Sequence, residues 1–519
     1  MNRRIRVTLA TAAATALTGG LLAGAAAPVT AATATAAGSQ LRGDFNGDGY
    51  RDVAIGVPAG TDGSWEAGWV GVVYGTSAGI DPTKRKILTQ SGSVNPGSSE
   101  GGDLFGAGLS VADFDGDGYS DLAVGAPGED ISPNSSQGTV TLYWGGPSGL
   151  GTSAALVKDP VAKDTNRFGG AITAGDFDGD GDTDLASYNA LSSTVSVLHG
   201  PFTRSGTWAS ASTVTLPETS AYATGFLSSG NVSGDAADDL VVQYRTLRGG
   251  TNRAWYFRGS ATGAGLVQEA VLPASHTSAV GDIDKDGYAD IAVADAYETT
   301  GVGGAVTVLY GGSAGLGTSR AATALTQNSP GVPGSSESGD RFGAALSISD
   351  VTGDGYGDLA VGLPGEDVGS LTDAGSLVLL RGSATGIAGT GNQSLTQNTS
   401  GIPGTAESKD QFGSFVLLTD VNNNGRADLT AAAIGEAVTG TTVRTGAVWR
   451  LPGATTGLTG TGSKSFGSYE LGRAREDQSF RPDTGRLRHP GRPEPEPANG
   501  HPGRRRRQRT PLRRLWRRP

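Results

Sequence analysis

Cysteine is absent from this chain, and its 519 residues include a single methionine and four histidines. Without cysteine, neither a disulfide nor a lipid anchor on an amino-terminal cysteine can form. After Ala25, no run reaches the roughly 20 apolar residues that cross a bilayer, so no transmembrane segment is expected. Long helical periodicity is missing as well. The chain must therefore stabilise itself with a large core or with bound metal, and its length allows a large core.

The amino-terminal segment has the composition of a targeting sequence. Arg3, Arg4 and Arg6 precede a long run of Ala, Leu, Thr and Gly residues, and small residues follow at a suitable cleavage position. This order predicts a secretory signal peptide over residues 1–31. The mature protein is therefore expected outside the cytoplasm, either secreted and extracellular or associated with the cell envelope.

One nonapeptide pattern returns seven times, roughly 50 to 70 residues apart, which is the repeat length of a propeller, solenoid or array. The clearest copy, from Asp113 to Asp121, has Asp at positions 1, 3, 5 and 9, Gly at position 6 for a sharp turn and a free carbonyl at position 7. These hard oxygen ligands fit calcium, whereas zinc prefers His or Cys. The copies start at Asp44, Asp113, Asp176, Asp282, Asp350, Asp420 and, in a decayed form, Asn231.

An EF-hand calcium loop begins with the same spacing but places a bidentate Glu at position 12. Here position 12 is Ile55 or Val124. The residues that follow the ninth Asp, such as Leu122-Ala-Val-Gly-Ala-Pro127, form a short apolar run that Gly and Pro end. Such a run is typical of a buried strand. We therefore expect the ninth Asp to close the loop and a strand to leave it.

Each full unit carries further marks. A Phe-Gly pair lies eight residues before the first Asp, as at Phe105-Gly106, and Gly-Ala-Pro or Gly-Leu-Pro follows the loop. Two more short strands come later, and one of them ends in a Gly turn at Tyr74-Gly75. A unit thus holds about four strands, and four-stranded blades repeated radially build a β-propeller. The sequence predicts an all-β fold, a seven-bladed β-propeller with calcium loops, over residues 32–470.

In the order Phe-Gly, calcium nonapeptide and Gly-Ala-Pro, these units resemble the FG-GAP repeats of the integrin α-subunit headpiece and of many secreted bacterial proteins. The resemblance covers roughly Leu41 to Gly462. It implies a seven-bladed propeller with calcium in loops between the first two strands of several blades. The copy at Asn231 departs from the pattern, with Ser233 at position 3, and the unit at Asp282 has no Phe-Gly before it.

The predicted metal ligands occupy positions 1, 3, 5 and 9 through side chains and position 7 through a carbonyl. Because the loops repeat and supply most ligands themselves, we expect several structural calcium ions that fix the loops instead of activating a substrate. The candidate ligands are Asp44, Asn46, Asp48, Tyr50, Asp52, Asp113, Asp115, Asp117, Tyr119, Asp121, Asp176, Asp178, Asp180, Asp182, Asp184, Asp282, Asp284, Asp286, Tyr288, Asp290, Asp350, Thr352, Asp354, Tyr356, Asp358, Asp420, Asn422, Asn424, Arg426 and Asp428.

Other patterns that point to function have ordinary structural explanations. Ser77 and Ser313 each lie in a Gly-x-Ser-x-Gly pattern like the nucleophile elbow of hydrolases, but other units carry the same turn without that pattern. Arg42-Gly43-Asp44 spells a tripeptide that integrins bind, yet Asp44 is the first ligand of its loop. His199 and His276 have no partner constellation in the sequence, so we interpret them as structural. No catalytic residue is predicted.

Residues 471–519 are rich in Arg, Pro and Gly. They are interpreted as a disordered basic extension, an anchor to anionic envelope polymers or the product of a shifted reading frame, and we favour the last. Phe466-Gly467 aligns with Leu395 of the preceding unit and is therefore not the next Phe-Gly mark. That mark is expected near Phe480, where it would close the ring by pairing with the first unit.

We expect a monomeric extracellular binding or cell-adhesion module with calcium as its cofactor and a protein or glycan as its ligand. The net charge is −11 although the arginines gather at the carboxyl end, so the body of the chain is acidic and a nucleic-acid partner is excluded. The alternatives are a secreted hydrolase of phospholipase or esterase type and a structural component of the cell envelope.

Overall fold

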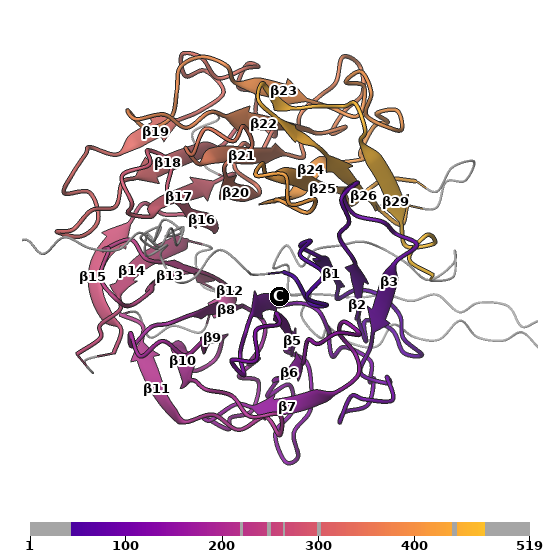
Figure 1. Ribbon diagram of the computed structural model, residues 1–519, viewed down its shortest axis with the longest axis vertical. Coiled ribbons are helices and arrows are strands. Elements are labelled where there is room, and N and C mark those ends of the chain that lie inside the picture. Colours follow the sequence, from indigo (N-terminus) through magenta and orange to yellow (C-terminus); the bar gives the residue numbers. More distant parts are fainter. Residues whose placement is uncertain are drawn as a thin grey trace, which may run out of the picture.

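The computed structural model describes residues 43–217, 222–246, 251–262, 265–297, 303–437 and 444–472, which form strands and turns but no helix. Seven antiparallel sheets are arranged as the blades of a propeller (Figure 1). Blades 2 to 7 have four strands, and blade 1 has three within the described residues. The predicted all-β, seven-bladed propeller is confirmed. The predicted signal peptide, and the basic tail beyond Gly472, lie outside the described residues.

The strands follow one another in chain order from the innermost to the outermost strand of most blades. The first three blades contain β1 (Val53–Val57), β2 (Trp69–Val73) and β3 (Arg85–Leu88); β4 (Leu109–Ala112), β5 (Asp121–Ala126), β6 (Thr139–Tyr143) and β7 (Ala154–Lys158); and β8 (Ile172–Gly175), β9 (Asp184–Asn189), β10 (Thr194–His199) and β11 (Ser210–Thr215).

The remaining four blades repeat this arrangement, and blade 7 adds a small hairpin before its last strand. They contain β12 (Tyr222–Gly230), β13 (Asp239–Thr246), β14 (Asn252–Arg258) and β15 (Val267–Leu272); β16 (Thr277–Gly281), β17 (Asp290–Asp295), β18 (Ala305–Leu309) and β19 (Thr323–Leu325); β20 (Leu346–Ser349), β21 (Asp358–Leu363), β22 (Ser376–Leu380) and β23 (Gln393–Leu395); and β24 (Phe412–Thr419), β25 (Asp428–Ala433), β26 (Ala447–Leu451) and β29 (Lys464–Gly467), with the hairpin β27 (Gly453–Ala454) and β28 (Gly457–Leu458).

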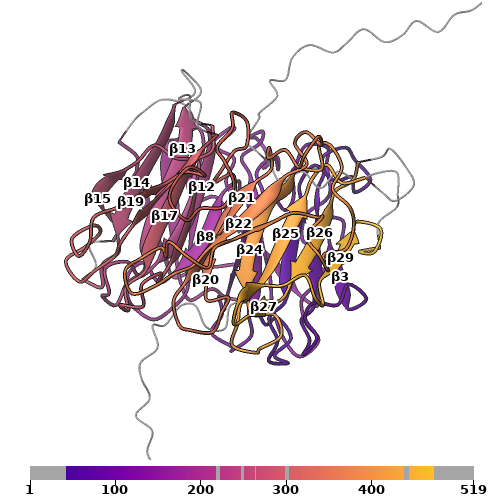
Figure 2. The ribbon, with the colours of Figure 1, turned by 90° about the horizontal axis from the view of Figure 1, so that it is seen from above.

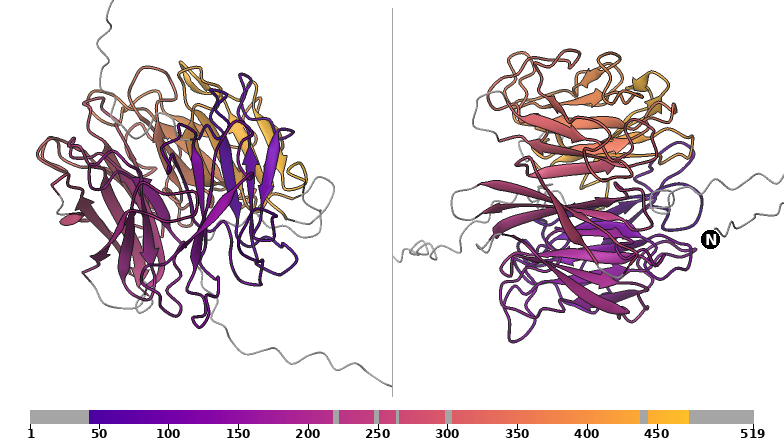
Figure 3. Two further views of the ribbon diagram at one scale, coloured as in Figure 1. Left: turned by 60° about the horizontal axis from the view of Figure 1, so that its bottom comes forward. Right: turned by 90° about the vertical axis from the view of Figure 1, so that its left-hand side faces the viewer.

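In blades 2 to 7 the nonapeptides connect the first and second strands, as Asp113–Asp121 does between β4 and β5, and in blade 1 the nonapeptide leads into β1. In an antiparallel sheet successive connections alternate ends, so the turns after the third strands lie at this same end. We call this end the loop face. The links between second and third strands, and those between blades, lie at the opposite face. The side views show the strands running between the two faces (Figure 2, Figure 3).

The second strand of a blade is buried and mostly apolar because sheets cover both of its sides. All six residues of β5, β21 and β25 are buried. An outer strand such as β11 is mostly exposed and polar. Around the axis, the innermost strands line a cavity of about 350 Å³ with small side chains that include Ser110, Thr173, Ser229, Ser278 and Ser347.

The Phe-Gly and Gly-Ala-Pro marks meet at the seam between neighbouring blades. A Cβ atom on Gly125 of blade 2 would lie 1.8 Å from the carbonyl oxygen of Gly169, which precedes β8 of blade 3. Phe168 is fully buried beside it and forms a parallel bridge with Gly138. The marks therefore need glycine because two backbones touch, and the Phe side chain fills the seam. Gly56 with Gly106, and Gly362 with Gly413, make equivalent contacts.

The ring closes where blade 7 packs against blade 1, and the two blades lie side by side in Figure 1. Val53 and Val73 share one apolar cluster with Val448, Phe466 and Leu471. Phe466 lies in β29, the outer strand of blade 7, which confirms that Phe466-Gly467 is not a Phe-Gly mark. The mark expected near Phe480 lies outside the described residues. No helix of the described part of the chain is long and apolar enough to cross a membrane.

Candidate metal centres

The nonapeptide loops that begin with Asp are wound around the carboxylate of that first residue. Asp44 accepts hydrogen bonds from the backbone N–H groups of Gly47 (2.7 Å), Asp48 (3.2 Å) and Gly49 (2.8 Å). Gly47 and Gly49 have φ angles of +70° and +86°, which glycine adopts without steric cost. Because the Asp44 carboxylate is directed into its own loop, it is a loop residue, as the sequence predicts, and not the end of an exposed recognition tripeptide.

The ninth Asp joins the loop to the turn after the third strand. Asp121 is fully buried, and its Oδ2 accepts the N–H of Phe114 at 2.9 Å while its Oδ1 accepts the N–H of Gly145 at 2.8 Å. One carboxylate therefore holds two connections of blade 2 together. The bond to the turn glycine recurs in the other blades, between Asp52 and Gly75, Asp184 and Gly200, Asp239 and Gly259, Asp290 and Gly311, Asp358 and Gly382, and Asp428 and Gly453.

The ninth Asp is an unfavourable place for a negative charge. The pKa of Asp52, Asp121 and Asp290 is raised to about 7. Burial is the main cause and the carboxylates earlier in each loop add to it, although backbone N–H groups lower the pKa in part. At neutral pH these loops therefore favour a bound proton or a nearby cation.

The third residue of several loops has a buried oxygen with no hydrogen-bond partner in the described part of the chain. Oδ1 of Asp115 and Oδ1 of Asp284 have no hydrogen-bond partner, although these side chains are only 8% and 5% exposed. Oδ1 of Asp178 and Oδ1 of Asn422 occupy the same position in blades 3 and 7 and also lack a partner. A buried carboxylate oxygen without a donor is costly, so a cation would fit beside these recurring oxygens.

The distances between the loop oxygens fit a calcium ion. Asp113, Asp115 and Asp121 each place one oxygen so that all three atoms lie within 4.8 Å of one another. Oxygens bound to calcium at 2.3–2.6 Å can be at most about 5 Å apart, so one ion could contact all three. The same holds for Asp282, Asp284 and Asp290 in blade 5 and for Asp176, Asp178 and Asp180 in blade 3.

Arginines lie at the mouths of two of these loops. Arg204 contacts Asp115 at 2.8 Å and Asp117 at 2.5 Å, and its side chain is 48% exposed. Arg320 contacts Asp284 at 2.9 Å. These guanidinium groups offset part of the loop charge from the solvent side, but they leave Oδ1 of Asp115 and Oδ1 of Asp284 without a partner.

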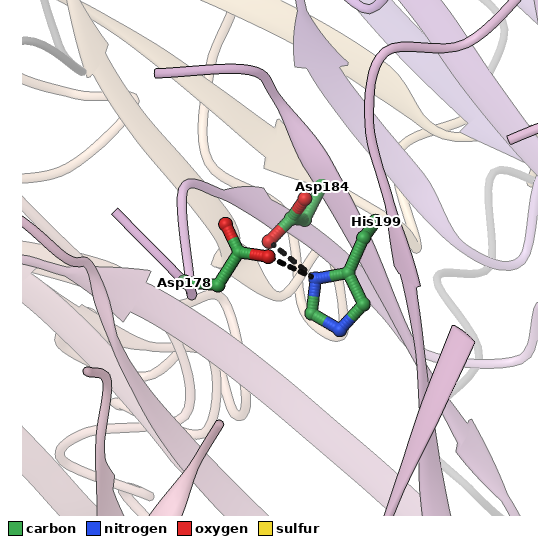
Figure 4. A group of neighbouring side chains, drawn as sticks. All are labelled: Asp178, Asp184 and His199. Atoms are coloured by element: carbon green, nitrogen blue, oxygen red, sulfur yellow. Dashed lines mark hydrogen bonds and ion pairs between the residues drawn. The ribbon is translucent and has the colours of Figure 1, made fainter. Parts of the chain in front are cut away.

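In blade 3 a histidine approaches the loop from within the blade. Figure 4 shows Nδ1 of His199, at the end of β10, facing Asp178 at 3.1 Å and Asp184 at 3.2 Å. Its Nε2 lies 2.9 Å from the hydroxyl of Ser212. The hydrogen bond with Asp184 raises the pKa of His199. The expectation that this histidine has no partner constellation is wrong, because the partners come from a loop that folds back onto it.

In blades 4, 6 and 7 an arginine side chain contacts a carboxylate of the loop. Arg450 is almost fully buried and donates to Oδ2 of Asp428 at 2.8 Å. Arg381 contacts Asp358 at 3.4 Å, and Arg258 contacts Asp235 at 3.0 Å. These loops carry fewer carboxylates than those of blades 2 and 5, and the chain supplies part of the positive charge itself.

The structure places all six predicted ligand sets in equivalent loops at one face. It brings carboxylates together most closely in blades 2, 3 and 5. In the loops at Asp44, Asp350 and Asp420, no three carboxylates of the described residues approach one another as closely. Sequence reasoning missed the basic residues beside the loops. Their signal is the residue before the turn glycine, which is aromatic in blades 1, 2 and 5 but His199, Arg258 or Arg381 in blades 3, 4 and 6.

The two serines of the hydrolase-like patterns lie in turns. Ser77 and Ser313 are exposed, and the chain enters an outer strand, β3 or β19, after each turn, whereas a nucleophile elbow leads into a helix. This arrangement supports their interpretation as blade turns.

Comparison with known proteins gives the same repeats. The FG-GAP repeat family matches residues 42–75, 105–143, 275–309 and 342–380, which lie in blades 1, 2, 5 and 6. The chain is 34% identical over 143 residues to phosphatidylinositol-glycan-specific phospholipase D of Rattus norvegicus, covering 27% of this chain and 17% of that protein. It is 32% identical over 161 residues to integrin alpha-6 of Gallus gallus, covering 30% of this chain and 13% of that protein. The chain thus spans less than a fifth of these relatives.

The internal cation of blade 7 gives a prediction about stability. Replacing Arg450 with Met leaves the buried Asp428 without its guanidinium, so the free energy of unfolding should fall by about 3–5 kcal/mol. The matched control is Arg204→Met, which removes an exposed contact and should cost about 1 kcal/mol or less. Urea unfolding of both variants measures the difference. Equal losses would contradict the assignment of Arg450 as the charge partner of its loop.

Proposed function

This chain carries FG-GAP repeats on a seven-bladed propeller, and we propose that it is a calcium-stabilised module that binds a protein or glycan outside the cell. The observation that carries the calcium assignment is the buried, partnerless Oδ1 of Asp115 and of Asp284 within groups of three converging carboxylates. Similarity to integrin alpha-6 and to phosphatidylinositol-glycan-specific phospholipase D supports an extracellular role.

The ions would be held mainly by Asp113, Asp115 and Asp121 in blade 2 and by their counterparts Asp282, Asp284 and Asp290 in blade 5. A calcium ion there supplies two positive charges to carboxylates that otherwise repel one another in a buried place. Its role is structural, because the ninth Asp also carries the hydrogen bond to the turn glycine. Through that bond, the ion stiffens the connection between the first two and the last two strands of the blade.

The proposed ligand surface is the opposite face, whose connections are free of the calcium loops. Trp65 lies there, in the link between β1 and β2, and 71% of its surface is exposed. Tyr297 follows β17 at the equivalent place in blade 5, is 45% exposed and lies under the guanidinium of Arg341. Exposed Trp, Tyr and Arg are the residue types enriched in binding hot spots. A rigid ring of blades holds these side chains in fixed positions.

A phospholipase or esterase is the alternative, because one relative carries that activity in its name. The matched part is 17% of that protein, and the serines of the hydrolase-like patterns lie in exposed turns without a following helix. The binding module is therefore the better supported function.

Calcium should raise the melting temperature of the purified protein. Millimolar calcium acting on sites with Kd of about 10⁻⁴ M stabilises the fold by roughly 1.4 kcal/mol per site. Calorimetry with calcium or with chelator measures the gain. Asp284→Asn should reduce it, whereas Asn424→Ala, in the loop that Arg450 serves, should leave it nearly intact. A melting temperature that chelator does not change would refute the calcium proposal.

The rise in melting temperature that calcium causes should depend on pH. The folded-state pKa of Asp121 and of Asp290 is about 7 against an ordinary 3.8, so the folded chain keeps protons that the unfolded chain releases. Without calcium, stability therefore falls as the pH rises from about 4 to about 7. Calcium takes the place of those protons, and its stabilising effect should be larger at pH 8 than at pH 5.

The proposed ligand surface can be tested by capture from a cell-surface extract and on a glycan array. We expect calcium-dependent binding that Trp65→Ala weakens at least about tenfold, because exposed aromatic anchors contribute roughly 1.5 kcal/mol or more to interfaces. Val271→Ala, on an outer strand with an equally exposed side chain, serves as the control. Binding that survives both Trp65→Ala and chelator would contradict this surface.

Substitution of the turn serines separates the binding module from the enzyme. Ser77→Ala and Ser313→Ala should leave stability within about 0.5 kcal/mol and should change no activity, because both side chains are exposed in turns. Asp121→Ala should lower stability strongly, because it opens the loop and the bond to Gly145. Urea unfolding and ester and phospholipid hydrolysis assays give both readouts. Hydrolysis that disappears with either serine at unchanged stability would favour the enzyme.

A further inference from the structure

A second acidic cluster lies on the opposite face, at the junction of blades 1 and 2. Glu100 and Asp103 belong to the link between β3 and β4, and Glu129 follows β5. Each of the three places one carboxylate oxygen so that all three oxygens lie within 4.8 Å of one another. None of these residues belongs to a nonapeptide loop. The cluster is therefore separate from the calcium loops, which lie at the other end of the strands.

The charges that act most strongly on the carboxylates of this cluster are themselves negative. Asp103 and Glu129 are buried, and the neighbouring charges that raise the pKa of Glu129 are those of Asp103, Glu100 and Asp130. The N–H of Glu100 donates to Asp103 at 2.6 Å, which offsets only a small part of the charge. Burial raises the pKa of Asp103 to about 6 and that of Glu129 to about 7. The cluster thus needs protons or a cation.

The amide of Gln90 points to a cation. This residue is only 3% exposed, and its Nε2 donates to Oε2 of Glu129 at 2.6 Å, so the amide group lies against the cluster. Its Oε1 is buried and has no hydrogen-bond partner among the described residues. A half-turn of the amide exchanges the two atoms and would add a fourth oxygen beside the three carboxylates. An amide oxygen and carboxylates are the ligands that hard divalent cations prefer.

The junctions of blades 5 and 6 and of blades 6 and 7 contain an equivalent glutamine–glutamate pair. Gln327 donates to Glu366 at 2.8 Å and Gln397 donates to Glu436 at 2.7 Å, and Oε1 of each glutamine again lacks a partner in the described part of the chain. At the junction of blades 6 and 7, an arginine, Arg444, also contacts an acidic residue, Asp410.

Arg444 shows that this position accepts a positive charge. It contacts Oδ1 of Asp410 at 3.4 Å and donates to the carbonyl oxygens of Ser408 and Gly435. Burial raises the pKa of Glu436 to about 7, and the field of Arg444 lowers it only in part. The junction of blades 6 and 7 thus holds an internal cation, whereas the charges that act most strongly on Glu129 are acidic.

We propose that Gln90, Glu100, Asp103 and Glu129 form a binding site for a hard divalent cation, calcium first among them, at the junction of blades 1 and 2. The ion would join the end of one blade to the link between two strands of the next. Glu100 is exposed, so the site would be open to solvent on that side. The surface that carries Trp65 lies beside it, since the N–H of Gly102 donates to the carbonyl oxygen of Trp65 at 3.1 Å.

Native mass spectrometry of the full chain during a calcium titration tests this site by counting bound ions. Glu129→Gln should bind one calcium ion fewer than the unmodified chain. Glu436→Gln is the matched control, because Arg444 serves that cluster, and its ion count should not change. Asp284→Asn removes a calcium loop on the other face. A loss with Glu129→Gln that adds to the loss with Asp284→Asn would assign the two ions to different sites.

A further variant keeps the test decisive if Glu129→Gln fails to fold. Glu100 is exposed, so Glu100→Gln should fold normally and should raise the Kd of one ion at least roughly tenfold. Circular dichroism and thermal melting check the fold of each variant. An ion count and affinities that equal those of the unmodified chain in Glu100→Gln would overturn the proposal, and the carboxyl groups would then hold protons. Equal losses of one ion in Glu129→Gln and Glu436→Gln would overturn it as well.

Discussion

The buried carboxylate of the ninth loop residue is the interaction on which the blades depend. In Asp121 and its counterparts, one oxygen accepts an N–H of the loop and the other accepts the N–H of the turn glycine after the third strand. The two bonds hold together connections that are about 24 residues apart in the chain. The cost is a negative charge in a place from which water is excluded. The basic residues beside the loops, or a bound cation, would offset that charge.

The blades differ in how they offset the buried negative charge of the ninth Asp. Blades 2 and 5 gather further carboxylates around the ninth Asp, and Arg204 and Arg320 offset only part of their repulsion, so a bound cation would stabilise these loops. Blades 4, 6 and 7 supply an arginine, of which Arg450 is the most deeply buried. Blade 3 has His199, whose charge depends on pH. The loops also join neighbouring blades, since the N–H of Ser120 donates to the carbonyl oxygen of Asp44 at 3.0 Å and the N–H of Gly146 donates to that of Phe45 at 3.0 Å.

The seam between blades depends on backbone contact instead. Gly125 and Gly169 approach so closely that any side chain would collide, and the Phe before the second glycine fills the remaining space. The two halves of the repeat motif therefore belong to different blades, and they are far apart in sequence but adjacent in space. With the seams packed in this way, the loop face serves the fold, and the opposite face is left to carry exposed aromatic residues and the acidic junctions.

The sequence by itself determined the class of fold, the number of repeats and the place of the loops, because these depend on local patterns. Alternating turn glycines and short apolar runs predict strands, and the Asp spacing within nine residues predicts which oxygens share a loop. The position of Phe466 in an outer strand also followed from the register of the repeats. These properties need no knowledge of distant contacts.

Only the tertiary structure decided which positive charges reach each loop. His199 lies 21 residues beyond Asp178 in the chain, and only its place before a turn glycine marks it in the sequence. Arg204 meets Asp115 from the next blade, so that pairing has no local signal. The acidic junction of Gln90, Glu100, Asp103 and Glu129 escaped sequence reasoning for the same reason, since its members come from two blades. Electrostatic partners are set by the packing of one blade against another, and that packing is a property of the closed ring.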